Sequence, residues 1–381
     1  MTRTGNIIGG LTALAAVAGV IIVIVQPRPP TPAAAVGPLP TVTLATAVAS
    51  TPTTSVYVYG GYRYFGDAQI IQILHDEYRI DVQGEFKKGT FAMSDDYDPA
   101  KQVVDCIFPG SKIGVEYFKL NHPGVIGSSV VAAQDRIVVF TWQELLPTLE
   151  ASGLIYTKDG ASYLRMKPLV DAMIAQQKWS DIQADIPGYV RVESTDPLTS
   201  SSGLQWLAFV GTYLVPGNET GGKVLTTQDL ETDPTIIPRL YQYWESQGAQ
   251  VDTTGKLFPK FVASGAGIPM IVAYESSFTD WYSPLPAQQK TQAAKIVGIY
   301  PETTINIEHT LAALTPACNP LLEAIAADPQ IQQLAWEAHG LHPQGYMPSG
   351  VPSSAPWLVL SIPYIPEPKK DVTDAIQAAL K

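Results

Sequence analysis

Short apolar runs and segments of helical periodicity alternate along most of this chain. The first example is an apolar, β-prone run at 55–59, a Gly-Gly turn, a helical pattern at 67–78 and a second β-prone run at 80–86. A strand–helix–strand unit of this kind joins two parallel strands, because the helix carries the chain back to the starting edge of the sheet. The pattern therefore predicts an α/β fold built on a parallel sheet.

Further segments extend this alternation to the end of the chain. Strands are predicted at 103–108, 136–142, 189–194, 268–274 and 295–300. Helices are predicted at 145–152, 166–177, 203–214, 320–326 and 331–339. Because roughly 290 residues of alternation exceed one ordinary α/β domain, we expect two lobes rather than one.

The N-terminal region has a different pattern. Residues 7–25 form an uncharged apolar run, about as long as a helix that spans the hydrocarbon core of a bilayer. We expect 1–26 to be an uncleaved transmembrane anchor, and a signal peptide cleaved near 33–35 is the alternative. Residues 27–54 are rich in Pro, Ala and Thr and predict an extended tether. A tethered body is expected to lie outside the cytoplasm, in the periplasm or on the cell surface.

The C-terminal end is distinct as well. Beyond residue 346 the chain is proline-rich, and it ends in a short amphipathic helix predicted at 371–381. The pattern of 347–381 does not decide whether this tail packs on the body.

Charge and cysteine content narrow the functional classes. With 24 basic and 35 acidic residues the formal net charge is −11, and no basic cluster is present that would suit a nucleic acid. Cys106 and Cys318 lie far apart in sequence, and neither belongs to a C-x-x-C pair. A disulfide outside the cytoplasm is one interpretation, but two separate buried thiols are the simpler one. No metal site is predicted.

The sequence lacks the patterns of common catalytic sites. It contains no G-x-S-x-G, H-E-x-x-H, P-loop or G-x-G-x-x-G motif, and its five histidines are scattered. His309, in an apolar context, is expected to be a core residue. No nucleophile and base can be paired, so we expect a binding protein without a cofactor rather than an enzyme.

Three loops after predicted strands carry the chemistry of a ligand site, because ligands of open α/β sheets bind beyond the carboxyl ends of strands. The turn at 60–63 offers two glycines and Arg63. The turn at 196–203 offers four consecutive hydroxyls at a helix start, which exceeds the needs of capping. The segment 274–277 offers a carboxylate. A tight turn, a helix cap and a locked loop are the respective structural alternatives.

Three longer segments support a family resemblance. They are VESTDPLTSSSGLQWLAFVG (192–211), LFPKFVASGAGIPMIVAYESSF (257–278) and the segment 299–346, which contains IYPETTINIEHTLAALTP. They resemble substrate-binding proteins of bacterial ABC importers, in the type II periplasmic-binding-protein superfamily near the phosphate-, molybdate- and tungstate-binding branches. The resemblance covers about 55–346.

That resemblance implies a two-lobed architecture. Lobe one is expected to comprise 55–138 and 299–346, and lobe two is expected to comprise 143–295. The strands at 136–142 and 295–300 are the implied hinge crossings, around which the lobes close on a ligand. The implied cleft residues are Gly61, Tyr62, Thr90, Gly110, Ser111, Thr141, Trp142, Thr199, Ser200, Ser201, Ser202, Tyr274 and Glu275.

The resemblance also implies a function. We expect the body to be a monomer that captures a small solute and delivers it to an ABC permease in the membrane. An oxyanion suits the hydroxyl-rich turn, whereas Thr199 in place of a basic residue, and Tyr62 with Arg63 in place of a small hydroxyl residue, leave a neutral or zwitterionic solute open. A tethered sensor or interaction module of the same fold, without a transport role, is the alternative function.

Overall fold

The computed structural model describes residues 52–352 and 354–381. The predicted anchor at 1–26 and nearly all of the predicted tether at 27–54 therefore lie outside the described residues. Within the described part of the chain, none of the helices combines the length and the apolarity needed to cross a membrane.

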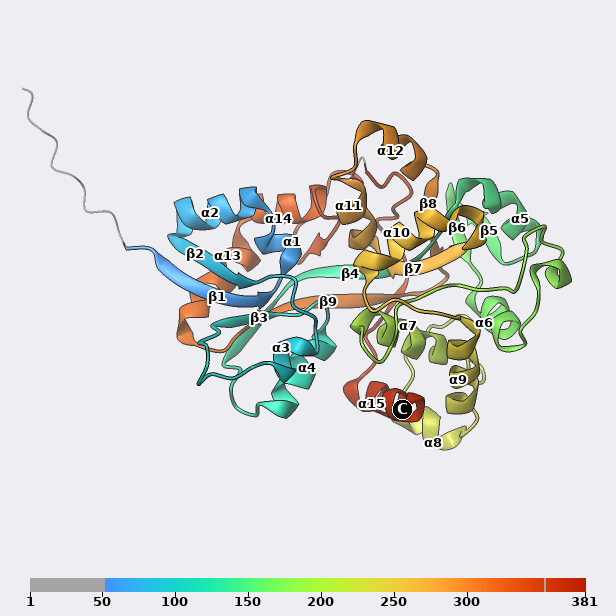
Figure 1. Ribbon diagram of the computed structural model, residues 1–381, viewed down its shortest axis with the longest axis horizontal. Helices are drawn as coiled ribbons and strands as arrows, with labels where there is room; N and C mark the ends of the chain where they lie inside the picture. Colours follow the sequence, from blue (N-terminus) through green and yellow to red (C-terminus); the bar gives the residue numbers. More distant parts are fainter. Residues whose placement is uncertain (1–51, 353) are drawn as a thin grey trace, which may run out of the picture. The chain divides into compact units, whose positions relative to one another are not determined.

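The first strands of the sheet are parallel, as the sequence predicts. Strand β1 (Thr54–Gly60) lies between β2 (Ile80–Glu85) and β3 (Cys106–Phe108) and runs parallel to both. The sheet then continues with two antiparallel partners, β9 (Thr304–Ala313) and β4 (Ser128–Trp142), which lie side by side through the middle of the fold (Figure 1). The sheet is mixed, so the expectation of a parallel sheet is wrong.

Strand β4 connects two parts of the sheet. Its residues 128–136 pair with β9, and its residues 137–142 pair with β7 (Met270–Tyr274) on one side and β8 (Ile296–Pro301) on the other. Residues 137–142 are all buried, because both faces of a strand in the middle of an α/β sheet are covered. Beyond β8 lie the remaining strands of this part, β6 (Ala161–Leu164) and β5 (Ile155–Lys158).

Helices flank the two parts of the sheet. Those associated with β1, β2, β3 and β9 are α1 (Tyr62–Phe65), α2 (Ala68–Tyr78), α3 (Ala92–Asp95), α4 (Lys112–Asn121), α13 (Asn319–Ala327) and α14 (Pro329–Glu337). The helices of the intervening segment are α5 (Leu146–Ala151), α6 (Met166–Ile174), α7 (Ser201–Thr212), α8 (Thr227–Thr232), α9 (Ile236–Ser246), α10 (Thr254–Ser264), α11 (Glu275–Tyr282) and α12 (Ala287–Ala293).

Local sequence explains where individual helices begin and which face they bury. In α2, the Asp67 side chain accepts hydrogen bonds from the backbone N–H groups of Gln69 and Ile70, which caps the first turn. Ile70 and Leu74, four residues apart on one face, are fully buried against the sheet. The predicted helix at 67–78 is confirmed for this reason.

Three strand predictions differ from the structure. The strand predicted at 103–108 is confined to β3, at 106–108. The strand predicted at 136–142 is the second half of the 15-residue strand β4, because 128–136 finds a partner in β9. Residues 189–194 form no strand. They contribute only isolated bridges, between Tyr189 and Lys178 and between Glu193 and Ile271, because no neighbouring segment offers continuous pairing.

The C-terminal tail packs on the body. Strand β11 (Tyr364–Pro366) pairs in parallel with β9, and helix α15 (Lys370–Leu380) contacts α4, α7 and α9. The described residues before β11 also meet the body, since Arg136 donates hydrogen bonds to the carbonyl oxygens of Val359 and Leu360 at 2.8 and 3.1 Å. The helix predicted at 371–381 is confirmed.

Cys106 and Cys318 form a disulfide, so the simpler interpretation as separate thiols is wrong. The bond joins β3 to the residues just before α13, and the two Cα atoms lie 5.7 Å apart. Sequence spacing did not reveal the pairing because 212 positions separate the two residues.

Candidate functional site

A cavity of about 630 Å³ lies between loops from distant parts of the chain. One side, here called the first wall, is formed by the loops that follow β1, β2 and β3: Gly60–Arg63, Phe86–Thr90, Phe108 and Gly110. The opposite side, the second wall, is formed by Thr199–Ser202, Asp252–Gly255 and Phe258. The base of the cavity, the floor, is formed by Tyr274, Ser277, Asp280, Trp281, His309 and Leu341.

The first wall depends on two glycines at the end of β1. Gly60 and Gly61 have φ angles of 86° and 71°, in the left-handed region that favours glycine. A Cβ atom on Gly60 would lie 2.4 Å from the carbonyl oxygen of Phe108, and one on Gly61 would lie 2.5 Å from the Phe108 ring. Because glycine has no side chain, the carboxyl ends of β1 and β3 can lie close together at the same edge of the cavity.

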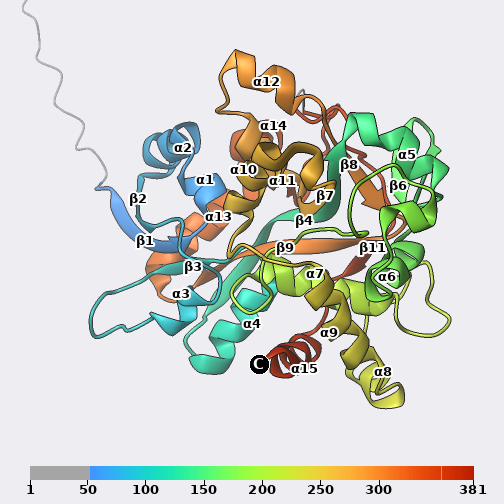
Figure 2. The same ribbon diagram turned by 45° about the vertical axis from the view of Figure 1, so that its right-hand side comes forward.

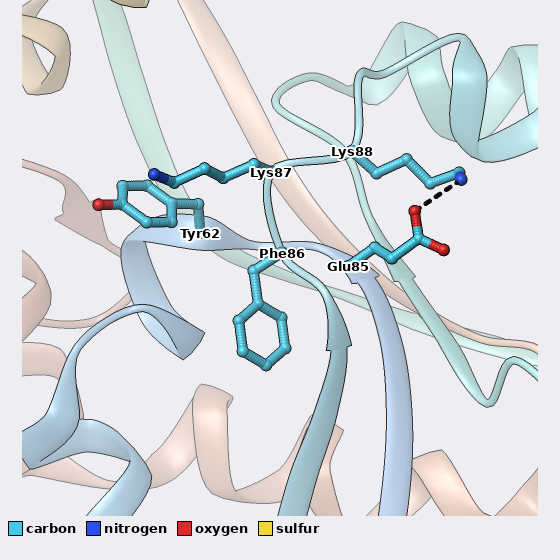
Figure 3. Close-up of a pocket in the computed structure, with 5 residues that line it drawn as sticks. All are labelled: Tyr62, Glu85, Phe86, Lys87 and Lys88. Atoms are coloured by element: carbon cyan, nitrogen blue, oxygen red, sulfur yellow. Dashed lines mark hydrogen bonds and ion pairs between the residues drawn. The ribbon is translucent and has the colours of Figure 1, made fainter.

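Lysine and aromatic side chains line the outer part of the first wall. A second hollow of about 440 Å³, next to the cavity, is lined by Tyr62, Glu85, Phe86, Lys87 and Lys88. Figure 3 shows the Lys87 side chain extended alongside the Tyr62 ring, and its Nζ lies 4.6 Å from the ring centroid. Lys88 is held at 3.0 Å by Glu85 and at 2.9 Å by Asp96, whereas Lys87 takes part in none of the described ion pairs.

The second wall is a cluster of hydroxyls at the start of α7. Thr195 Oγ1, Ser200 Oγ and Ser202 Oγ lie 2.9–3.0 Å from one another, so these three hydroxyls orient each other. Ser200 is the N-cap residue, but its side chain makes no hydrogen bond to the backbone of the first turn. The backbone N–H groups at the start of α7 thus remain for a ligand.

Helix α10 also begins at the second wall. Its N-cap residue, Thr253, makes no side-chain capping hydrogen bond, and Thr254 and Gly255 of the first turn line the cavity. Two helix N-termini, each with the positive end of a helix dipole, therefore face the same space.

A network of ion pairs crosses the floor. Arg63 Nε lies 2.5 Å from Asp280 Oδ2, and the other oxygen of Asp280 lies 2.9 Å from His339 Nδ1. His339 Nε2 in turn lies 3.0 Å from Asp67. Burial alone would lower the pKa of Arg63, but Asp280 and Asp135 outweigh it and raise that pKa. The charge of Arg63 is thus largely neutralised by the protein itself.

Two aromatic side chains of the floor keep polar atoms without a protein partner. Tyr274 Oη and His309 Nε2 are buried and make no hydrogen bond to the described residues, although His309 Nε2 lies 3.5 Å from Asp135 Oδ2. Burial raises the pKa of Tyr274, which keeps its hydroxyl protonated and able to donate. His309 is buried, as the sequence predicts, and it also borders the cavity.

Ten of the fourteen predicted site residues line the cavity. They are Gly61, Tyr62, Arg63, Thr90, Gly110, Thr199, Ser200, Ser201, Ser202 and Tyr274. Most of them lie at a strand end or a helix start, where local sequence could place them, whereas Thr90 and Gly110 were expected from the family resemblance alone.

The other four, Ser111, Thr141, Trp142 and Glu275, are buried outside the cavity. Thr141 donates to the carbonyl oxygen of Pro269 at 2.9 Å, and Trp142 Nε1 donates to that of Gly265 at 3.1 Å. Glu275 interacts with Tyr300 and His342, and Ser111 is the N-cap residue of α4. These contacts explain why Thr141, Trp142 and Glu275 turn away from the cavity, whereas the buried Ser111 hydroxyl makes no hydrogen bond to the described residues.

Several lining residues were not predicted from the sequence, among them Lys87, Asp280 and the loop Asp252–Gly255. Lys87 could have been predicted as a lining residue, because it directly follows the predicted strand at 80–86 and so lies at the carboxyl end of a strand. The loop at 252–255 had none, since neither α10 nor its N-terminus was predicted.

Comparison with solved structures places the fold. The ferric binding protein from Campylobacter jejuni matches with a TM-score of 0.57 at 8% identity, over 86% of this chain and 96% of that one. Iron-bound HitA from Pseudomonas aeruginosa matches with a TM-score of 0.53 at 12% identity, over 87% and 97%. A periplasmic thiamin binding protein matches with a TM-score of 0.53 at 12% identity, over 86% and 94%.

These similarities show that the chain has the mixed α/β fold of these three proteins. No protein-family model and no curated protein matches the sequence. The three solved structures are iron- and thiamin-binding proteins, so they give no support to the narrower resemblance to phosphate-, molybdate- and tungstate-binding branches.

Proposed function

We propose that the protein binds a small organic anion outside the cytoplasm and delivers it unchanged to an ABC permease. The observation that carries this proposal is the convergence of two uncapped helix N-termini and Lys87 on one hydroxyl-lined cavity. In this proposal the lobes 55–138 with 299–346, and 143–295, close on the solute around the crossing strands.

The charges around the cavity favour an anion. Arg63 and Asp280 neutralise one another, and Asp252 is paired with Lys256 at 2.7 Å. Lys87 and the N-termini of α7 and α10 then leave a positive balance. Serine and threonine hydroxyls at the second wall supply the directional donors that an anionic oxygen needs.

Aromatic side chains and cavity size favour an organic ligand over a bare oxyanion. Tyr62, Phe86, Phe258 and Trp281 border the same cavity and offer flat apolar surfaces. A volume of about 630 Å³ falls within the range of small-molecule sites, roughly 300–1,000 Å³. A single tetrahedral oxyanion would leave most of it unfilled.

The disulfide supports a location outside the cytoplasm, because such bonds persist in oxidising compartments. The metal of the ferric binding proteins is not carried over to this chain. Within 52–352 and 354–381, no group of three or more His, Cys, Asp or Glu side chains is arranged to hold a metal ion.

A thermal-shift screen of the full chain tests the proposal. The panel contains sugar phosphates, aromatic carboxylates, inorganic phosphate, molybdate, tungstate, amino acids and neutral sugars. A ligand at one hundred times its dissociation constant stabilises the native state by about 2.7 kcal/mol, which is easily measured. We expect organic anions to raise the melting temperature and neutral sugars to leave it unchanged.

Two variants locate the site. Lys87→Met removes the unpaired cation, and the matched control Lys101→Met removes a highly exposed lysine that is far from the cavity lining. We expect the first to weaken anion binding about tenfold, which corresponds to about 1.4 kcal/mol, and the second to have no effect. Stabilisation by neutral sugars or amino acids alone would overturn the proposal.

A further inference from the structure

Glu367, in the C-terminal tail, connects three elements that surround the cavity. Its Oε1 accepts hydrogen bonds from the backbone N–H groups of Glu308 at 2.6 Å and Lys112 at 3.3 Å. Its Oε2 accepts one from Gln205 Nε2 at 2.5 Å. One carboxylate therefore binds strand β9, the first residue of α4 and the first turns of α7.

These contacts lie directly behind the two walls. Lys112 follows Gly110 of the first wall by two residues. Gln205 follows Ser201 of the second wall by four residues, which places both on the same face of α7. Any shift of Glu367 is thus transmitted to the loops that line the cavity.

The rest of the tail holds Glu367 in place. Strand β11 ends one residue before it and pairs with β9, and α15 begins three residues after it. Helix α15 packs against α4 on one side and against α7 and α9 on the other, and it lies beside these helices in both ribbon views (Figure 1, Figure 2). Lys370 Nζ of α15 also lies 5.7 Å from the centroid of the Tyr117 ring on α4.

Unpartnered polar atoms gather around this carboxylate. Gln205 Oε1, Ser111 Oγ and Tyr274 Oη are buried and make no hydrogen bond to the described residues. Gln205 donates to Glu367, Ser111 precedes Lys112, and the charge of Glu367 acts on Tyr274. Because such atoms are rare in protein interiors, a polar cluster of this kind indicates a region adapted to binding or to a change of protonation.

We propose that Glu367 is a positioning residue of the binding site, which fixes the spacing of the two walls from behind and makes that spacing depend on protonation. The proposal rests on the proposed binding function only for its last consequence, the change in ligand affinity. Its structural part concerns the protein without any ligand.

The direction of the pH dependence follows from burial. Burial raises the pKa of Glu367 to about 7, and the hydrogen bonds from Glu308, Gln205 and Lys112 reduce this rise without cancelling it. A detached, solvated tail would return the pKa to its ordinary value near 4.5. The packed tail therefore binds the proton more tightly, so this stabilisation of the tail is fully present below about pH 4.5 and is lost as pH rises through about 7.

The other charged groups facing Glu367 agree with this direction. The negative charge of Glu308 repels the ionised carboxylate of Glu367 and so raises its pKa. Lys112 Nζ lies 3.5 Å from Glu308 Oε2 and pairs with that carboxylate instead. From α15, Lys370 pairs with Asp374. Both of these lysines therefore pair with carboxylates other than Glu367.

Gln205 suits both protonation states. With Glu367 ionised, its Nε2 donates, as the structure shows. With Glu367 protonated, a half-turn of the amide presents the unpartnered Oε1 as an acceptor for the carboxyl hydrogen. The Gln205 side chain thus offers an acceptor to the protonated carboxyl, the state in which the tail is held most firmly.

The first experiment measures the distance between α4, which begins just after Gly110 of the first wall, and α9, which packs on α7 of the second wall. Spin labels are attached to the variants Lys119→Cys on α4 and Gln242→Cys on α9. Both positions are exposed, and both native cysteines are held in the disulfide, so no other thiol takes up a label. For the unsubstituted Glu367 protein, we expect a narrow distance distribution at pH 6 that broadens at pH 8.5. Glu367→Gln, which mimics the protonated carboxyl, should stay narrow at both pH values, and Glu367→Ala should be broad at both.

The second experiment tests the link to binding. The probe is whichever organic anion gives the largest shift in the thermal screen, and its dissociation constant is measured from pH 6 to 8.5. We expect affinity to fall across this range in the wild type, to stay constant in Glu367→Gln and to be reduced at all pH values in Glu367→Ala. The control is Asp374→Asn, which removes an exposed carboxylate of the same tail.

The outcomes separate the two proposals. Unchanged distance distributions in both Glu367 variants and at both pH values overturn the positioning role. If the distances respond as expected but no anion binds, the proposed function fails while the positioning role stands. A response in Asp374→Asn equal to that of Glu367→Ala would assign the effect to the tail in general and also overturn the role of Glu367.

Discussion

Ser201 Oγ lies 3.3 Å from Thr90 Oγ1 and donates a hydrogen bond to it across the cavity. Ser201 is the first residue of α7, whereas Thr90 lies in the loop after β2, and 111 positions separate them in sequence. The two walls therefore touch directly. A solute that enters the cavity meets walls already joined at this point, with Glu367 behind them.

The Thr90–Ser201 contact predicts an energetic coupling between the walls. We expect Thr90→Val and Ser201→Ala, combined in a double-mutant cycle, to give a coupling of about 0.5–1.5 kcal/mol in the free energy of unfolding. Urea denaturation measures it. Pairing Thr90→Val with Ser246→Ala provides the control, because Ser246 instead donates to the carbonyl oxygen of Tyr243. Equal couplings in the two cycles would show that the contact has no energetic role.

The first wall predicts a strict requirement for glycine at position 61. Gly61 and Gly124 have similar φ angles, 71° and 79°, but a Cβ atom on Gly61 would lie 2.5 Å from Phe108 whereas one on Gly124 would meet nothing within 4 Å. Gly124→Ala should cost about 1–2 kcal/mol from the left-handed conformation alone. Gly61→Ala should cost a further 1–3 kcal/mol, roughly, because it crowds the Phe108 and Phe65 rings.

The difference between these two variants isolates the close approach of the backbone. It is measured as the difference in free energy of unfolding by chemical denaturation. If both variants lose the same stability, the space around Gly61 must relax, and the glycine is needed for its φ angle only.

Local patterns explain why much of the fold and cavity could be predicted. Asp67 caps a helix whose apolar face is visible in the sequence, and the hydroxyls of Thr199–Ser202 stand at a helix start that their own composition marks. Strand ends and helix starts gather at one edge of an α/β sheet, so these residues could be placed near a ligand without knowledge of tertiary contacts.

Long-range contacts explain what could not be predicted. The disulfide joins residues 212 positions apart, and the Glu367 carboxylate reaches α4, α7 and β9 from the last twenty residues. Glu367 lies between prolines in a polar tail, and nothing in that pattern announces a buried carboxylate. Thr141 illustrates the opposite error, because the family resemblance placed it in the cleft, whereas its hydroxyl donates to the carbonyl oxygen of Pro269.

The disulfide predicts a large contribution to stability. For a separation of 212 residues, the chain-entropy model gives about 5 kcal/mol as an upper estimate for the effect of closing the loop. We expect the double variant Cys106→Ala with Cys318→Ala to unfold at much lower urea concentration than the oxidised protein, with reduced wild type close to the variant. Identical midpoints for all three proteins would show that packing around β3 and α13, not the covalent bond, maintains this junction.

The floor network predicts an unusual titration of His339. Burial alone would lower the pKa of His339, but hydrogen bonds and charge from Asp280 and Asp67 outweigh it and raise that pKa above 6.5. Because the folded-state pKa is the higher one, the stabilisation from protonated His339 is fully present below pH 6.5 and is lost as pH rises through the raised value. We expect Asp280→Asn to lower the pKa of His339, measured from its imidazole proton resonances, and to weaken this pH dependence of stability.

Since the same substitution also removes the partner of Arg63, the imidazole resonance and not the overall stability is the decisive measurement. Asp374→Asn, which changes an exposed carboxylate of α15 and leaves the floor intact, should not alter the titration, and an unchanged titration in Asp280→Asn would show that Asp67 alone sets the pKa of this histidine.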